Sequence, residues 1–100
     1  MPIAQLTVVP LGTGDTSLSG AVAAVVAAIR DTGIRYRLTP MATVLEGSIE
    51  EILAAVRAAH EAGFAAGSGR VSTSLTIDDR RDKATSMAHK VAAVEAKMKD

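Results

Sequence analysis

The chain has 100 residues, 48% of them hydrophobic, which predicts one domain over residues 1–100 with a single modest core. Its 11 basic and 11 acidic residues cancel and are scattered, which argues against a nucleic-acid-binding surface. Cysteine is absent and no apolar run approaches the ~20 residues of a membrane span, so we expect a cytoplasmic protein without disulfides, thiolate chemistry or membrane partners.

The first elements predicted are a strand and a helix. Residues 3–10 alternate in hydrophobicity as a half-buried strand does, and residues 11–17 form the turn that follows. The next helix ends at Gly33, a common helix stop. Its possible N-caps are Asp15, Thr16 and Ser17. Its apolar stripe consists of Leu18, Val22, Val25, Val26 and Ile29.

Two short strands and a second helix come next. Residues 34–40 and 41–46 predict strands, with Pro40 marking their connection. Ser48 and Glu51 have the spacing of a capping box, and Gly63 ends the helix that this box begins. The apolar face of that helix is predicted to contain Ile49, Ile52, Leu53, Val56 and His60.

Residues 69–78 form the clearest strand pattern in the chain. Strict alternation separates a largely apolar face from a polar face. The apolar face holds Val71, Thr73, Leu75 and Ile77, and the polar face holds Arg70, Ser72, Ser74, Thr76 and Asp78. Since solvent faces often have this composition, the pattern alone assigns no function.

A last helix follows, and Asp82 is its predicted cap. Its apolar positions step by three and four residues, the spacing of a helix that lies against one partner surface. These positions are Ala84, Met87, Val91, Val94 and Met98.

The order of elements predicts an α+β fold. Strand, helix and strand occur twice, which gives the ferredoxin-like βαββαβ arrangement with a four-stranded antiparallel sheet and an extra C-terminal helix. Both inner helices then cover one face of the sheet, and the other face is open. The open face is predicted to carry Gln5, Thr7, Arg35, Arg37, Thr39, Thr43, Arg70, Ser72, Ser74, Thr76 and Asp78, together with Val9 and Leu45. A face of this kind suits packing against a second subunit, so we expect an oligomer.

Three segments carry a resemblance to a known family. They are PLGT (residues 10–13), PMATVLEG (residues 40–47) and RVSTSLTIDDRRDK (residues 70–83). They resemble the thiamine-binding, MTH1187 and YkoF-like proteins, over nearly the whole chain. The resemblance implies a ferredoxin-like subunit, assembly as a dimer of dimers, and thiamine or its hydroxymethylpyrimidine part as the ligand near a subunit interface. Ala42 replaces a glycine often found in the family's PMGT-like stretch.

Five residues are the candidate ligand contacts: Thr43, Glu46, Arg70, Ser72 and Ser74. The Glu46 carboxylate suits a thiazolium cation or an aminopyrimidine donor, although a loop or first-turn glutamate can serve the helix dipole instead. The hydroxyls of Thr43, Ser72 and Ser74 both donate and accept hydrogen bonds, but they can also bond across the sheet. Arg70 can equally form a salt bridge between strands or subunits.

We find no catalytic set in the sequence. The two histidines lie on separate helices without a nucleophile nearby, and arginines dilute the acidic residues of the DDRRD run at residues 78–82, which disfavours a metal. The sequence therefore predicts a non-enzymatic small-molecule binding protein that needs no cofactor or metal. The alternative is an oligomeric regulatory or scaffolding module without a small ligand.

Overall fold

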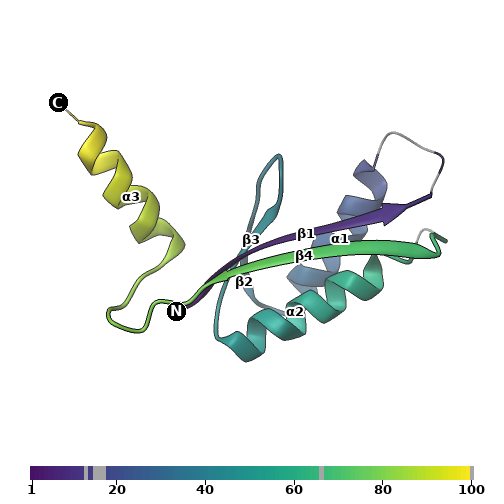
Figure 1. Cartoon of the computed structure of the whole chain (residues 1–100), viewed down its shortest axis with the longest axis horizontal. Coiled ribbons are helices and arrows are strands. Elements are labelled where there is room, and N and C mark those ends of the chain that lie inside the picture. The colour runs from purple at the N-terminus through teal and green to yellow at the C-terminus, as the bar shows by residue number, and fades with distance from the viewer. Residues whose placement is uncertain (13, 15–17, 66, 100) are drawn as a thin grey trace.

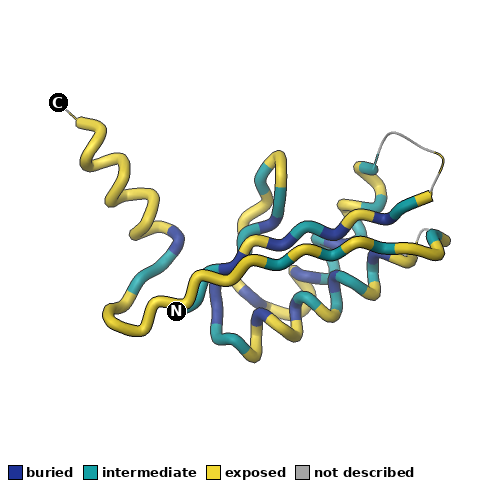
Figure 2. Tube along the Cα trace, in the orientation of Figure 1, coloured by how far each residue is buried: buried dark blue, intermediate teal, exposed yellow. Residues whose placement is uncertain are grey.

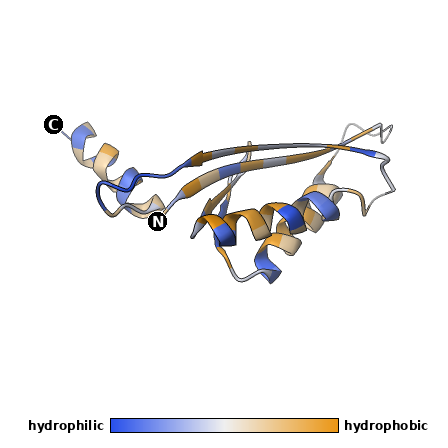
Figure 3. Cartoon of the chain, turned by 60° about the horizontal axis from the view of Figure 1, so that its bottom comes forward, coloured by the Kyte–Doolittle hydropathy of each residue, from blue (hydrophilic) through white to orange (hydrophobic). Residues whose placement is uncertain are grey.

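The fold is built on a four-stranded antiparallel sheet with strand order β2-β3-β1-β4. A computed structural model describes residues 1–12, 14, 18–65 and 67–99. The elements are β1 (Ile3–Leu11), α1 (Ser19–Asp31), β2 (Arg35–Leu38), β3 (Thr43–Glu46), α2 (Ile49–Ala62), β4 (Arg70–Asp78) and α3 (Met87–Met98). Helices α1 and α2 pack against each other on one side of the sheet (Figures 1 and 3). This topology confirms the predicted ferredoxin-like fold with an extra C-terminal helix.

The core lies between the sheet and these two helices. Strand β1 supplies Ala4, Leu6 and Val8 at alternate positions, as its sequence pattern predicts. Helix α1 supplies Val25 and Ile29. The core cluster is Ala4, Leu6, Val8, Val25, Ile29, Ile34, Leu45, Ile52, Ala55 and Ala59. The side-chain caps predicted for α1, Asp15 to Ser17, lie outside the described residues.

The register of β4 confirms its predicted polar face. Strand β4 pairs with β1 along its whole length, from Ile3 opposite Asp78 to Leu11 opposite Arg70. Directly opposite residues share a face of the sheet, so Ser72 and Ser74 lie on the face opposite the helices. We call this side, which α1 and α2 do not cover, the open face.

The two faces of strand β3 are exchanged relative to the prediction. Leu45 and Thr43 were expected on the open face, but they pair with Ala4 and Leu6 and lie on the helix-covered face. Leu45 is 0% exposed. Val44 lies on the open face instead, because side chains alternate along the strand. The side chain of the larger apolar residue therefore enters the core.

Helix α2 begins with the predicted capping box. The Ser48 hydroxyl accepts a hydrogen bond from the Glu51 backbone N–H at 3.1 Å, and the Glu51 carboxylate accepts one from the Ser48 N–H at 2.9 Å. Ile52 lies in the core as predicted. Leu53 does not, because its position on the helix turns it outward and leaves it exposed.

The capping box predicts a specific pH dependence of stability. The Ser48 backbone N–H, and then its hydroxyl, hold the pKa of Glu51 below its usual value. This contribution to stability is complete above the unfolded-state pKa, about 4.3, and is lost as the pH falls through the lowered pKa. In urea titrations between about pH 5 and 3, Glu51→Gln should therefore lose stability less steeply than the wild type. Equal slopes for Glu51→Gln and the wild type would contradict the assignment.

Helix α3 extends beyond the sheet, and its buried residue among those described lies in its first turn (Figures 1 and 2). Its N-cap is Ser86, whose hydroxyl accepts a hydrogen bond from the His89 N–H. The prediction of Asp82 as the cap is wrong, because that carboxylate pairs with Arg80 instead. Met87 is buried, whereas Val91, Val94 and Met98 are exposed. None of the helices in the described segments is long and apolar enough to cross a membrane.

Candidate functional site

The five predicted contact residues lie in three separate places. Arg70, Ser72 and Ser74 are exposed on the open face of β4. Glu46 lies on the same face at the opposite end of the sheet, since it pairs with Ile3 whereas Ser72 pairs with Val9. Six residues of strand separate these two positions by about 20 Å. The structure therefore does not bring the five residues to one point, and their binding roles stay predictions.

The carboxylate of Glu46 already has partners within the chain. Glu46 is 8% exposed, and its Oε2 accepts a hydrogen bond from the Met87 N–H at 3.2 Å. Its Oε1 lies 3.8 Å from the Arg35 guanidinium. A carboxylate placed at a helix N-terminus satisfies a free N–H group and favours the helix dipole. Glu46 thus attaches the first turn of α3 to the sheet, a role that its sequence position did not reveal.

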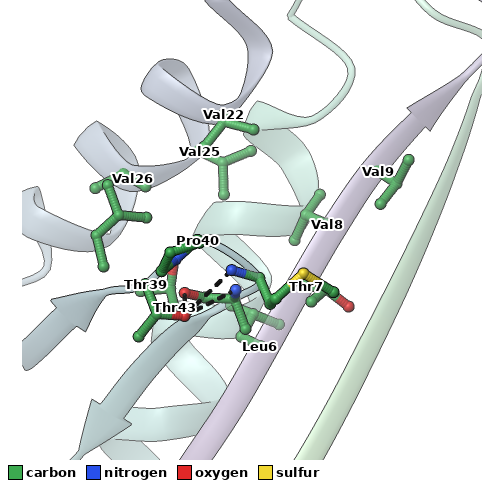
Figure 4. Close-up of a pocket in the computed structure, with 13 residues that line it drawn as sticks. Leu6, Thr7, Val8, Val9, Val22, Val25, Val26, Thr39, Pro40 and Thr43 are labelled. Atoms are coloured by element: carbon green, nitrogen blue, oxygen red, sulfur yellow. Dashed lines mark hydrogen bonds between the residues drawn. The ribbon is translucent and has the colours of Figure 1, made fainter. Parts of the chain in front are cut away.

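Thr43 lies on the helix-covered face and lines a pocket there. The pocket has a volume of about 140 Å³ and opens between β1, α1 and the hairpin that joins β2 to β3 (Figure 4). Val8, Val22 and Val25 supply part of its apolar wall. Its other lining residues are Leu6, Thr7, Val9, Val26, Leu38, Thr39, Pro40, Met41, Ala42 and Thr43.

The Thr43 hydroxyl is a polar group of this pocket that is available to a ligand. The residue is only 5% exposed, and its hydroxyl makes no hydrogen bond to the described part of the chain. No side-chain nitrogen or oxygen of the described residues is both fully buried and without a partner, so this hydroxyl keeps some accessible surface at the pocket wall. A hydroxyl both donates and accepts hydrogen bonds, so it can recognise a polar atom of a ligand.

The hairpin beside the pocket is held in shape by Thr39. The Thr39 hydroxyl donates to the Ala42 carbonyl at 2.8 Å and accepts from the Ala42 N–H at 3.1 Å (Figure 4). Apolar side chains project from this hairpin: Leu38 is 55% and Met41 85% exposed. Exposed apolar residues that rim a pocket are typical of a surface covered by a partner or ligand. Sequence reasoning missed this pocket because its walls come from three separate segments of the chain.

His60, which was predicted to lie on the apolar face of α2, makes two specific contacts. Its Nδ1 lies 2.7 Å from the Thr73 hydroxyl, on the helix-covered face of β4. Its ring meets the Phe64 ring edge-on, with a centroid separation of 5.4 Å. The first contact joins α2 to β4 and gives the Thr73 hydroxyl a hydrogen-bond partner. The His60–Thr73 pair is therefore structural.

The fold and the pocket define the class of the protein: a small ferredoxin-like α+β protein with an apolar pocket beside its sheet. The family model for thiamine-binding protein matches residues 4–95. The chain therefore belongs to the thiamine-binding protein family, and this confirms the resemblance found in the sequence.

Relatives and solved structures agree with this membership. A UPF0045 protein of Methanothermobacter thermautotrophicus is 50% identical over 99 residues, which covers 98% of this chain and 100% of the relative. The UPF0045 protein YqgV of Bacillus subtilis is 42% identical, with 94% of each chain covered. A hypothetical protein of Methanocaldococcus jannaschii has a similar structure, with a TM-score of 0.86, 33% identity and coverage of 94% of this chain and 95% of the other.

A further solved structure is also connected with thiamine. A Thermotoga maritima protein with a proposed role in thiamine biosynthesis or salvage superposes with a TM-score of 0.77 and 25% identity. The match covers 93% of this chain and 97% of that protein. The family model and this neighbour together suggest a thiamine-related role.

Proposed function

We propose that this protein binds thiamine or its hydroxymethylpyrimidine part without transforming it, and that the pyrimidine ring occupies the pocket at Thr43. The observation that carries the proposal is Thr43, a residue only 5% exposed whose hydroxyl has no partner among the described residues, in a largely apolar pocket. Apolar pockets with a few polar groups are the usual form of small-molecule sites. An aminopyrimidine offers both donors and acceptors to such a hydroxyl.

The size of the pocket supports a single ring as the buried part of the ligand. Its volume of about 140 Å³ is below the roughly 300–1,000 Å³ of sites that enclose drug-sized molecules. The thiazolium end of thiamine would then extend past Met41 towards the exposed hairpin. A second subunit placed over this hairpin would cover both the ligand and the apolar side chains of Leu38 and Met41.

We further propose assembly as a dimer of dimers in the cytoplasm. Strand β4 is an edge strand, and between Val71 and Ile77 it carries no charge and no proline. Such an edge is open to pairing with a strand of another copy. The polar open face would then lie within reach of a neighbouring subunit, where Arg70 can form an intersubunit salt bridge.

Substitution of Thr43 by valine tests the site. Valine keeps the shape of threonine but has no hydroxyl, and a neutral hydrogen bond contributes about 0.5–1.5 kcal/mol. Calorimetry should show that Thr43→Val binds thiamine and hydroxymethylpyrimidine about three- to tenfold more weakly than the wild type. Thr76→Val, on the open face, is the matched control and should retain full affinity. Equal affinities for wild type and Thr43→Val would remove Thr43 from the site.

A scaffolding module is the second candidate, and the exposed apolar residues of α3 favour it. Val91, Val94 and Met98 lie along the outward part of this helix. A binding protein should gain melting temperature as free ligand exceeds its dissociation constant. An unchanged melting temperature with thiamine, its phosphates and the free pyrimidine would favour scaffolding.

A further inference from the structure

A second cavity lies on the other side of the sheet from the Thr43 pocket. It has a volume of about 280 Å³ and lies between the open face and the first turns of α3. Ile3 and Val44 form its floor, and Met87 and Val91 of α3 form its roof. Its walls are therefore largely apolar, although the rest of the open face is polar.

Three contacts between distant parts of the chain hold the roof in place. The Met87 N–H donates to Glu46 at 3.2 Å, and Lys90 forms an ion pair with Asp78. The N-terminal ammonium of Met1 donates to the Thr85 carbonyl at 3.1 Å. Met87 is buried, so these contacts fix the first turn of α3 beside the cavity.

Among the described residues around this cavity, one cation has no partner. Glu46 is used by the Met87 N–H and by Arg35, and Asp78 is used by Lys90. Arg37 is an exposed residue that lines the cavity, and its guanidinium makes no ion pair or hydrogen bond with the described residues. A guanidinium binds carboxylates through two parallel hydrogen bonds, so this position favours an anion.

We propose that this cavity binds a small monocarboxylate with an apolar body, whose carboxylate pairs with Arg37. The apolar walls suit a single ring or a short hydrocarbon chain. The single unpaired cation among the described lining residues matches one negative charge, whereas a phosphate monoester carries ≈ −1.5 to −2 at pH 7 and would need a second cation. Thiamine carries a positive thiazolium, so this site is distinct from the one proposed at Thr43.

Benzoate is a suitable probe for the test, with cyclohexanecarboxylate and phenyl phosphate beside it. Titration of the full-length protein should shift the NMR signal of the Met87 methyl group saturably with both carboxylates. Arg37→Gln should weaken benzoate binding about tenfold or more, because hydrogen bonds to charged groups are among the stronger ones. Arg57→Gln removes the same charge from the exposed surface of α2 and should bind benzoate as the wild type does.

The outcomes separate this proposal from the thiamine site. Arg37→Gln should keep the wild-type affinity for thiamine, whatever that affinity is. Failure of both carboxylates to bind, equal benzoate affinities in the two arginine variants, or tighter binding of phenyl phosphate would each overturn the carboxylate site. None of these results bears on the role of Thr43.

Discussion

Leu45→Ala is expected to lower the free energy of unfolding by about 2–5 kcal/mol, the usual range for removing a buried leucine side chain. Leu45 is 0% exposed and is one of the largest side chains in the core. It pairs with Ala4 on β1 and lies beneath the helices, where the surrounding side chains can only partly fill the space left by three carbon atoms. Urea unfolding of wild type and variant measures the difference.

Val44→Ala is the matched control for this experiment. Val44 is the next residue along β3 but lies half-buried on the open face. Its truncation should cost about 1 kcal/mol or less, since it removes less buried apolar surface. A larger loss of stability for Val44→Ala than for Leu45→Ala would mean that Val44, and not Leu45, faces the helices. A shift of one residue in the pairing of β3 would exchange its two faces in this way.

Gly63→Ala is expected to destabilise the protein by about 1–3 kcal/mol, the range typical of overpacking. Gly63 ends α2 where the helix meets the sheet. An added Cβ would lie 2.9 Å from Val8 Cγ1 and 3.1 Å from Val71 Cγ1. Its φ of −60° is accessible to alanine, so the effect comes from the close approach and not from backbone strain. The midpoint of thermal or urea unfolding should fall accordingly.

Gly20→Ala is the control for this experiment and should not lower the stability of the protein. Gly20 lies in the first turn of α1, and an added Cβ would meet nothing within 4 Å. Alanine is favoured over glycine in helices by up to about 1 kcal/mol, so this variant should be neutral or more stable than the wild type. If both substitutions stabilise the protein, helix α2 must lie farther from the sheet than the structure places it.

The sequence determined the elements with strong local signals. The alternation along residues 70–78 predicted both faces of β4, and the spacing of Ser48 and Glu51 predicted the start of α2. These signals succeed because they depend on periodicity and hydrogen bonds within a few residues. The order of the elements then sufficed for the ferredoxin-like topology, and the residues of three segments sufficed for the family.

Only the tertiary structure decided which residues of β3 face the helices and which residues surround the cavities at Thr43 and Arg37. A four-residue strand with Val44 and Leu45 side by side has no alternation that distinguishes its faces, so its pairing with β1 sets the orientation. That pairing carries Thr43 into the pocket beneath the helices and places Glu46 where it meets Met87, 41 residues further along the chain. Contacts across such separations depend on the packing of the whole domain, and no local pattern encodes them.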